Sequence, residues 1–353
     1  MRTRRTRNYA AQTMESSSIS FGELAKQFLE DRKARGNASQ TIKHYGQSIR
    51  KLETFFAYRT CGKEEYTLLT REEAIDYGAS VQCSILDEKN LDSSFRSFLY
   101  EVEGLGEQTV NTYFRDYRVI VYYAIDQQLV RERNIIVKSA ETGVKDVYTA
   151  DELEKLLRKP DQDCIFSEYR NWVVVNYLLA TGNRVGTIVN LKISDLDFDD
   201  YMIAVNTQKN KRKTRIPMER EQLAKILRHY IDEWLTDENG RYTTEFLFPS
   251  SYAENDKAMN RVSMGRAIAN YNKSRGVNKT SIHLFRHTFA KSWIIHGGDL
   301  HSLQRILGHS TLDMVVHYAN LYDTDLNDKV AEFSTLSQFQ SQGRHSLRKR
   351  QKS

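Results

Sequence analysis

Residues 283–318 read HLFRHTFAKSWIIHGGDLHSLQRILGHSTLDMVVHY. Apolar residues repeat at helical spacing on both sides of a Gly-Gly pair, which predicts two short helices joined by a turn. His283 and Arg286 are three residues apart and should share one face of the first helix. A later glycine turn places His309 at the start of a further helix that carries Tyr318. Cationic and proton-transferring groups with a positioned phenol are what a metal-free attack on a phosphodiester requires.

The composition describes a globular chain with a basic bias. With 353 residues it is long enough for two domains. Only 3 prolines favour long helices over a loop-rich fold. Lysine and arginine exceed the acids by 52 to 46, which gives a net charge of +6 and fits a polyanionic partner. Much of the excess lies at the ends, so we expect a basic flexible arm over residues 1–18 and a basic tail over residues 341–353.

The cysteines and the hydropathy exclude two classes of protein. Three cysteines without CxxC or Cys/His spacing indicate neither a disulfide framework nor a zinc site. No apolar run reaches membrane-spanning length, and no hydrophobic signal region follows the arginine-rich start. We therefore expect a cytoplasmic protein with no membrane partner.

The order of predicted elements indicates a mostly α protein with a small β-sheet. Capping boxes at Ser20 and Thr149 each begin a helix. Residues 19–138 should form a helical domain, 139–148 a linker, and 149–340 a second domain. Helices are expected near 20–35, 39–56, 71–77, 91–103, 108–128, 150–158, 167–180, 219–235, 261–274, 283–296 and 299–306. Strands at 202–206 and 214–218 should form a hairpin around the polar turn QKNKRK.

Three motifs together resemble the tyrosine recombinase (phage integrase) family: HLFRH, LGHS and the tyrosine that follows them. Residues 180–197, ATGNRVGTIVNLKISDLD, resemble the first arginine box of that family and place Arg184 at its catalytic arginine. The family also has a lysine on a β-hairpin turn. Lys209 fits its spacing to the proline that ends the second strand better than Lys211 or Lys213.

The resemblance implies a catalytic site and a fold. Its residues are Arg184, Lys209, His283, Arg286, His309 and the nucleophile Tyr318. The two arginines would clamp the scissile phosphate, because guanidinium groups bind phosphate oxygens in pairs. The implied fold is a helical core DNA-binding domain over residues 19–138 followed by an α/β catalytic domain.

Two positions depart from the family pattern or leave a choice open. Thr187 stands where the family usually has an acid that orients the arginine and histidine, and Asp195 is too far along the chain to be assumed a substitute. Tyr322, one helical turn beyond Tyr318, is a second possible nucleophile.

The resemblance also implies a reaction and its partners. A 3′-phosphotyrosyl intermediate conserves the bond energy, so no cofactor is needed. The expected substrate is a pair of double-stranded DNA recombination sites held by a homo-tetramer, with a possible accessory directionality factor, in the nucleoid-associated cytoplasm. We expect a mobile-element integrase or transposase; a Xer-type dimer resolvase is the alternative within the family. A type IB topoisomerase and a non-catalytic DNA-binding factor on the same fold are the alternatives outside it.

Overall fold

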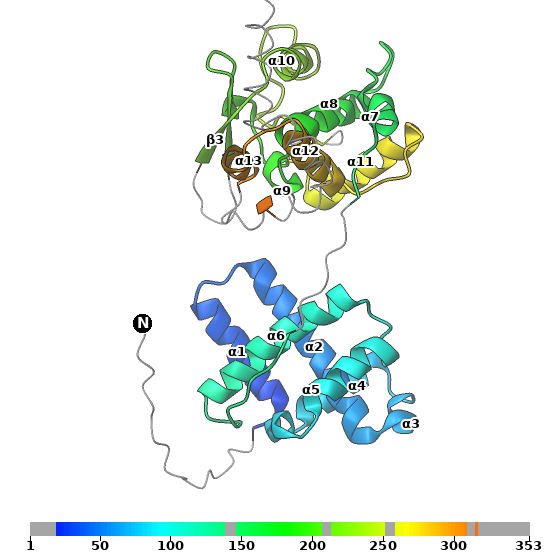
Figure 1. Ribbon diagram of the computed structural model, residues 1–353, viewed down its shortest axis with the longest axis vertical. Helices are drawn as coiled ribbons and strands as arrows, with labels where there is room; N and C mark the ends of the chain where they lie inside the picture. The colour runs from blue at the N-terminus through cyan, green and yellow to red at the C-terminus, as the bar shows by residue number, and fades with distance from the viewer. Residues whose placement is uncertain (1–18, 138–145, 207–212, 251–257, 309–314, 317–353) are drawn as a thin grey trace, which may run out of the picture. The chain divides into compact units, whose positions relative to one another are not determined.

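The computed structural model describes residues 19–137, 146–206, 213–250, 258–308 and 315–316. The chain divides into two compact units, Met1–Glu141 and Thr142–Ser353 (Figure 1). Within the described ranges, no helix is both long and apolar enough to cross a membrane.

Over residues 19–137, every named element of the first unit is a helix, and one isolated antiparallel bridge joins Ser20 to Gln82. Its elements are α1 (Phe21–Ala34), α2 (Ser39–Cys61), α3 (Lys63–Tyr66), α4 (Arg71–Ser80), a 3₁₀ helix (Cys83–Asp87), α5 (Leu91–Ser97), a π-helix (Phe98–Val102) and α6 (Glu107–Asp126). The capping box at Ser20 is confirmed, because its hydroxyl accepts the Glu23 amide hydrogen at 3.2 Å. Thr70 caps α4 in the same way, although the sequence had not singled it out.

Aromatic residues build the core of this unit. Phe21 on α1 meets Phe56 on α2 edge-to-face, with 4.8 Å between ring centroids, and Phe55 lies against Phe95 at 5.0 Å. Helices α2 and α4 approach so closely that a Cβ atom at Gly78 would lie 1.8 Å from the carbonyl oxygen of Glu53. Only glycine allows this helix contact.

Two acids lie inside the helical unit. Glu53 is 7% exposed, and burial raises its pKa to about 7, a rise that the charge of Arg50 opposes. Asp116 on α6 accepts a hydrogen bond from the Ser48 hydroxyl at 2.5 Å and lies 2.9 Å from Nε2 of His44. Both of these partners are on α2, so Asp116 ties α2 to α6.

The second unit combines helices with one small sheet. Its elements are α7 (Ala150–Leu157), α8 (Phe166–Thr181), α9 (Val185–Ile188), a 3₁₀ helix (Ile193–Asp195), β1 (Leu196–Asp197), β2 (Met202–Asn206), β3 (Lys213–Pro217), α10 (Leu223–Trp234), α11 (Arg261–Ser274), α12 (His283–Ile295) and α13 (Leu300–Leu307). The strands are antiparallel in the order β1-β2-β3, and Ile203 pairs with Ile216. The predicted hairpin and the predicted fold class are confirmed.

Helix α8 lies at the centre of this unit. Figure 1 shows α7, α10, α11 and α12 around it, and all four contact it. Its buried residues lie on all sides and include the polar Arg170 and Asn171, as expected for a helix enclosed by others. Val173, Val174 and Tyr177 are completely buried. Because α8 ends directly before the Arg184 turn, the central helix of the core fixes the start of the candidate site.

Several predicted helices have different bounds in the structure, and two of the differences have local reasons. The helix expected at 219–235 begins at Leu223, because the Glu219 carboxylate accepts the amide hydrogens of Gln222 and Leu223 at 2.8 Å. The single helix expected at 91–103 is α5 continued by the π-helix Phe98–Val102. Apolar spacing does not distinguish these two windings.

Candidate active site

A left-handed glycine forms the turn that carries Arg184. Gly182 ends α8 with φ +61, and a Cβ atom there would lie 2.5 Å from Cδ1 of Phe289 and 2.8 Å from Cδ2 of Leu307. Both the conformation and the space therefore require glycine. Arg184 follows as the residue preceding α9, with an extended backbone and an exposed side chain.

Arg286 joins two turns that are far apart in sequence. Its Nη1 donates to the Gly182 carbonyl oxygen at 2.8 Å, and its Nη2 donates to the Leu307 carbonyl oxygen at 2.9 Å. The side chain is buried, with 5% exposure. One guanidinium therefore fastens the end of α8, next to Arg184, to the end of α13, two residues before His309. We call this arrangement the Arg286 clamp.

Helix α12 carries His283 at its first position, where the side chain is exposed. The three-residue spacing predicted that His283 and Arg286 share one face of this helix, and in the structure the Arg286 guanidinium donates to the Gly182 and Leu307 carbonyl oxygens. Contacts to Tyr148 fix the helix. The Tyr148 amide donates to Oγ1 of Thr288 at 3.0 Å, and its ring lies 4.6 Å from that of Phe285.

A buried polar pair supports the Arg184 turn, and the sequence had not indicated it. Nδ2 of Asn183 donates to Oη of Tyr177 at 2.9 Å, and the Asn183 amide donates to Oγ1 of Thr181 at 3.4 Å. Burial raises the pKa of Tyr177 above its usual range; the bond from Asn183 opposes the rise, and the charge of Asp195 adds to it. Asp195 is therefore close enough in space to act on the tyrosine beneath the turn.

Three predicted site residues, Lys209, His309 and Tyr318, lie outside the described residues, as does the alternative nucleophile Tyr322. The described strands β2 and β3 end on either side of the segment that contains Lys209. Thr187 is half-buried on α9, and its amide donates to the Arg184 carbonyl oxygen at 2.9 Å. Over the described ranges, no group of three or more potential ligands could hold a metal ion.

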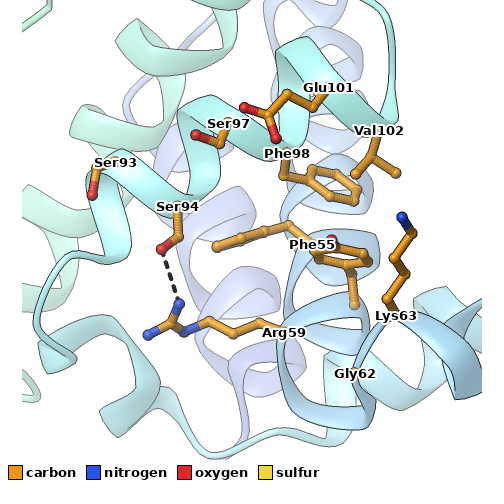
Figure 2. A pocket seen from close by; sticks show the side chains of 11 residues that line it. Phe55, Arg59, Gly62, Lys63, Ser93, Ser94, Ser97, Phe98, Glu101 and Val102 are labelled. Carbon is orange, nitrogen blue, oxygen red and sulfur yellow. Dashed lines mark hydrogen bonds between the residues drawn. The ribbon is translucent and has the colours of Figure 1, made fainter.

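The helical unit has a groove of about 460 Å³ between the end of α2 and the segment formed by α5 and the π-helix. Figure 2 shows Arg59 reaching across it to Ser94, with 3.0 Å between Nη1 and Oγ. Phe55 and Phe98 form its apolar wall. None of the predicted site residues lines this groove, so the candidate site is confined to the second unit.

Comparison with known proteins identifies the family. Residues 146–325 match the phage integrase family. Tyrosine recombinase XerD of Listeria monocytogenes is 25% identical over 304 residues, which cover 85% of this chain and 94% of that protein. Tyrosine recombinase XerA of Pyrococcus furiosus is 26% identical over 229 residues, covering 65% and 73%. The chain belongs to the phage integrase family of tyrosine recombinases and is a DNA strand-exchange enzyme.

Solved structures share the fold. The Tn1549 transposon integrase in complex with transposon right end DNA superposes with a TM-score of 0.62 at 21% identity. The match covers 93% of this chain and 100% of that one. A lambda integrase tetramer bound to a Holliday junction gives 0.61 at 15% identity, covering 84% and 79%. The expected family and fold are thus confirmed, whereas the catalytic residues remain predictions.

Proposed function

We propose that the chain is a site-specific recombinase that integrates and excises a mobile element, with Tyr318 as its nucleophile. The Arg286 clamp is the observation that carries the proposal. It fastens the turn of Arg184 to the end of the helix that leads to His309, although the bonds span 104 and 21 residues of sequence. Residues that the motifs assign to one site thus belong to segments that a single side chain holds together.

In the proposed reaction, Oη of Tyr318 attacks the scissile phosphorus and the bond from phosphorus to the 5′-oxygen breaks. The tyrosine proton passes to His283, and Lys209 donates a proton to the leaving 5′-oxygen. Arg184 and Arg286 offset the charge that develops on the non-bridging oxygens, and His309 donates a hydrogen bond to one of them. A 5′-hydroxyl of the second strand then reverses the steps, so no cofactor is consumed.

The proposed substrate is a pair of double-stranded DNA sites bound by four copies of the chain. A complete exchange cuts four strands, and each copy supplies one nucleophile. The solved lambda integrase tetramer on a Holliday junction supports this stoichiometry. We assign the helical unit and the basic ends, residues 1–18 and 341–353, to DNA binding, and residues 139–148 to the linker between the domains. A directionality factor and a nucleoid-associated, cytoplasmic location belong to the same proposal.

A Xer-type role in resolving chromosome or plasmid dimers is the second candidate. The XerD relative, matched over 94% of its length, favours it. The Tn1549 integrase, which superposes over 93% of this chain, favours the mobile-element role. Sequencing the DNA that borders the gene separates the two: paired attachment sites or terminal repeats support the mobile element, and a conserved chromosomal locus without them contradicts it.

The nucleophile is tested with a suicide substrate, a duplex that full-length protein selects from a randomised pool and that carries a nick near the cleavage position. We expect wild type to form a covalent protein–DNA adduct and Tyr318→Phe to form none, with unchanged DNA affinity, because only the attacking oxygen is lost. Tyr322→Phe is the matched control and should behave as wild type.

Other results would contradict the proposal in distinguishable ways. An adduct that persists in Tyr318→Phe and disappears in Tyr322→Phe would move the nucleophile to Tyr322. No adduct from wild type that binds the duplex would favour a non-catalytic DNA-binding factor. Relaxation of a single supercoiled circle without any four-way junction would favour a type IB topoisomerase.

A further inference from the structure

The side chain of Arg184 lacks a direct support in the part of the chain that the structure describes. It is exposed, and it makes no hydrogen bond or ion pair to any described residue. Thr187 stands where the family usually has an acid, so that position offers no charge to orient the guanidinium. The direction in which Arg184 leaves the protein therefore depends on the backbone of its turn.

Side chains fix that backbone one residue at a time. Oγ1 of Thr181 donates to the Tyr177 carbonyl oxygen at 2.8 Å and accepts from the Asn183 amide. The Gly182 carbonyl oxygen is held by Arg286. The Asn183 carboxamide is fastened to the Tyr177 phenol at 2.9 Å. The three residues that precede Arg184 are thus each held, and Tyr177 is reached from two of them.

The Tyr177–Asn183 bond differs from ordinary packing because it places two polar groups in the core. Tyr177 is fully buried, and Asn183 is 6% exposed. Burying a hydroxyl and a carboxamide costs free energy that their mutual bond helps to offset, whereas an apolar pair of similar shape fills the same space without that cost. Tyr230 shows that a buried phenol need not be paired, since its hydroxyl has no hydrogen-bond partner within the described ranges.

We infer that Tyr177 and Asn183 are positioning residues that aim Arg184 at the scissile phosphate. This inference rests on the proposed role of Arg184 in strand cleavage. The bond spans the end of α8, so the last turn of the central core helix sets the angle of the Arg184 turn. An orienting function that the family usually gives to an acid beside the arginine is here given to a buried, uncharged pair beneath it.

The test measures single-turnover adduct formation by the full-length protein on saturating suicide substrate. Tyr177→Phe should slow it by about 10- to 100-fold, as expected when a reacting group is misplaced by a fraction of an ångström to one ångström. DNA affinity should change less than about 3-fold, because the few phosphate contacts at one site contribute little to total affinity. Tyr230→Phe is the matched control, a buried tyrosine of the same unit without a partner to lose, and should cleave as wild type.

Two further measurements separate positioning from a general loss of structure. On a duplex whose scissile phosphate is a neutral methylphosphonate, the defect of Tyr177→Phe should shrink to less than about 3-fold, because there is less charge for Arg184 to offset. In a double-mutant cycle, the variant with both Tyr177→Phe and Asn183→Ala should form the adduct no more slowly than the slower single variant. The reason is that each substitution removes the same hydrogen bond.

The outcomes are separable from those of the proposed function. If wild type forms no adduct, the proposed function fails. If wild type forms one and Tyr177→Phe forms it at the same rate, only the positioning role is overturned. Equal defects on phosphate and methylphosphonate, or additive defects in the cycle, also overturn it, because they show that the substitution acts through the fold and not through Arg184.

Discussion

At the scale of single residues, the Arg286 guanidinium is the group on which the candidate site depends. It is buried, and two of its hydrogen bonds end on backbone carbonyl oxygens, groups that rarely remain unpaired inside a protein. Arg286 thus has a structural role in the protein without DNA, in addition to the proposed contact with phosphate. Lysine, with one ammonium group, cannot replace the planar fork that spans both turns.

Arg286→Met should destabilise the second unit. The substitution keeps a long apolar stem and leaves the Gly182 and Leu307 carbonyls without their donor, at a cost of about 1 to 3 kcal/mol each. Chemical denaturation measures the change. Lys225→Met is the control, since its exposed pair with Glu221 at 3.1 Å contributes less than about 0.5 kcal/mol. Equal stability of the two variants would remove the structural role from Arg286.

Motifs locate the site residues, but they do not show what those residues contact. The capping boxes at Ser20 and Thr149 follow from local rules, and both are present. The bonds of Arg286 span 104 and 21 residues, and no local pattern encodes them. Tyr177 is one of 20 tyrosines, and nothing in its neighbours marks it as the one that holds Asn183.

At the scale of elements, the contact between α2 and α4 leaves no space for a side chain at Gly78. Gly78 allows the two backbones to approach, and the carbonyl oxygen of Glu53 occupies the space of a side chain. Sequence periodicity predicted both helices but did not indicate how closely their backbones approach. The reason is that periodicity reports which face is buried and not how close the neighbour lies.

Gly78→Ala should destabilise the helical unit, because its Cβ would lie 1.8 Å from the Glu53 carbonyl oxygen and 2.5 Å from its carbon. Overpacking of this kind costs about 1 to 3 kcal/mol or more. Gly46→Ala in α2 is the matched control: nothing lies within 4 Å of its Cβ position, so the same change should stabilise α2 by about 1 kcal/mol. Urea denaturation compares the two, and changes of equal sign would contradict the close contact.

Glu53 makes the stability of the helical unit depend on pH. Burial raises the pKa of Glu53 from its ordinary value of 4.5 to about 7, so the folded state holds the carboxyl proton more tightly than the unfolded chain does. The associated stability is complete below about pH 4.5 and is lost as the pH rises to 7, up to about 3 kcal/mol. Glu53→Gln should remove this loss, which denaturation at pH 5 and pH 8 would show.

Glu73→Gln supplies the opposite case. Hydrogen bonds from Thr70 lower the pKa of Glu73, so its contribution is lost as the pH falls. Glu53→Gln and Glu73→Gln should therefore change the pH dependence of the unfolding free energy in opposite directions. A Glu53→Gln variant with the same loss of stability from pH 5 to pH 8 as wild type would show that Glu53 is ionised at little cost.

At the scale of the whole molecule, the two units have separate cores. The buried cluster of the first unit runs from Phe21 to Ile135. The second unit has a main cluster from Tyr148 to Phe285 and a smaller one from Ala290 to Val315, and neither shares a residue with the first unit. Apolar residues at helical spacing and the two capping boxes predicted a helical domain followed by a second domain with a small sheet. They did not predict α3, because a segment this short has too few residues to show a period, and they did not distinguish the π-helix from the helix expected at 91–103.

The full chain should therefore unfold in two transitions, one for each core. Differential scanning calorimetry of wild type and of one destabilised variant of each unit measures the number of transitions. Gly78→Ala should lower one transition and Arg286→Met the other, by several degrees each. A single transition that both variants shift equally would show that the two cores unfold as one cooperative system.

The burial of α8 has a consequence for synthesis on the ribosome. Part of its surface is covered by α12, whose core residue Phe285 is synthesised more than a hundred residues after α8 ends at Thr181. At about 5 to 20 residues per second, the nascent chain carries α8 without the cover of α12 for roughly 5 to 20 s. During that interval, apolar residues of α8 that are buried in the folded protein are exposed. Chaperone binding during translation should therefore concentrate on α8.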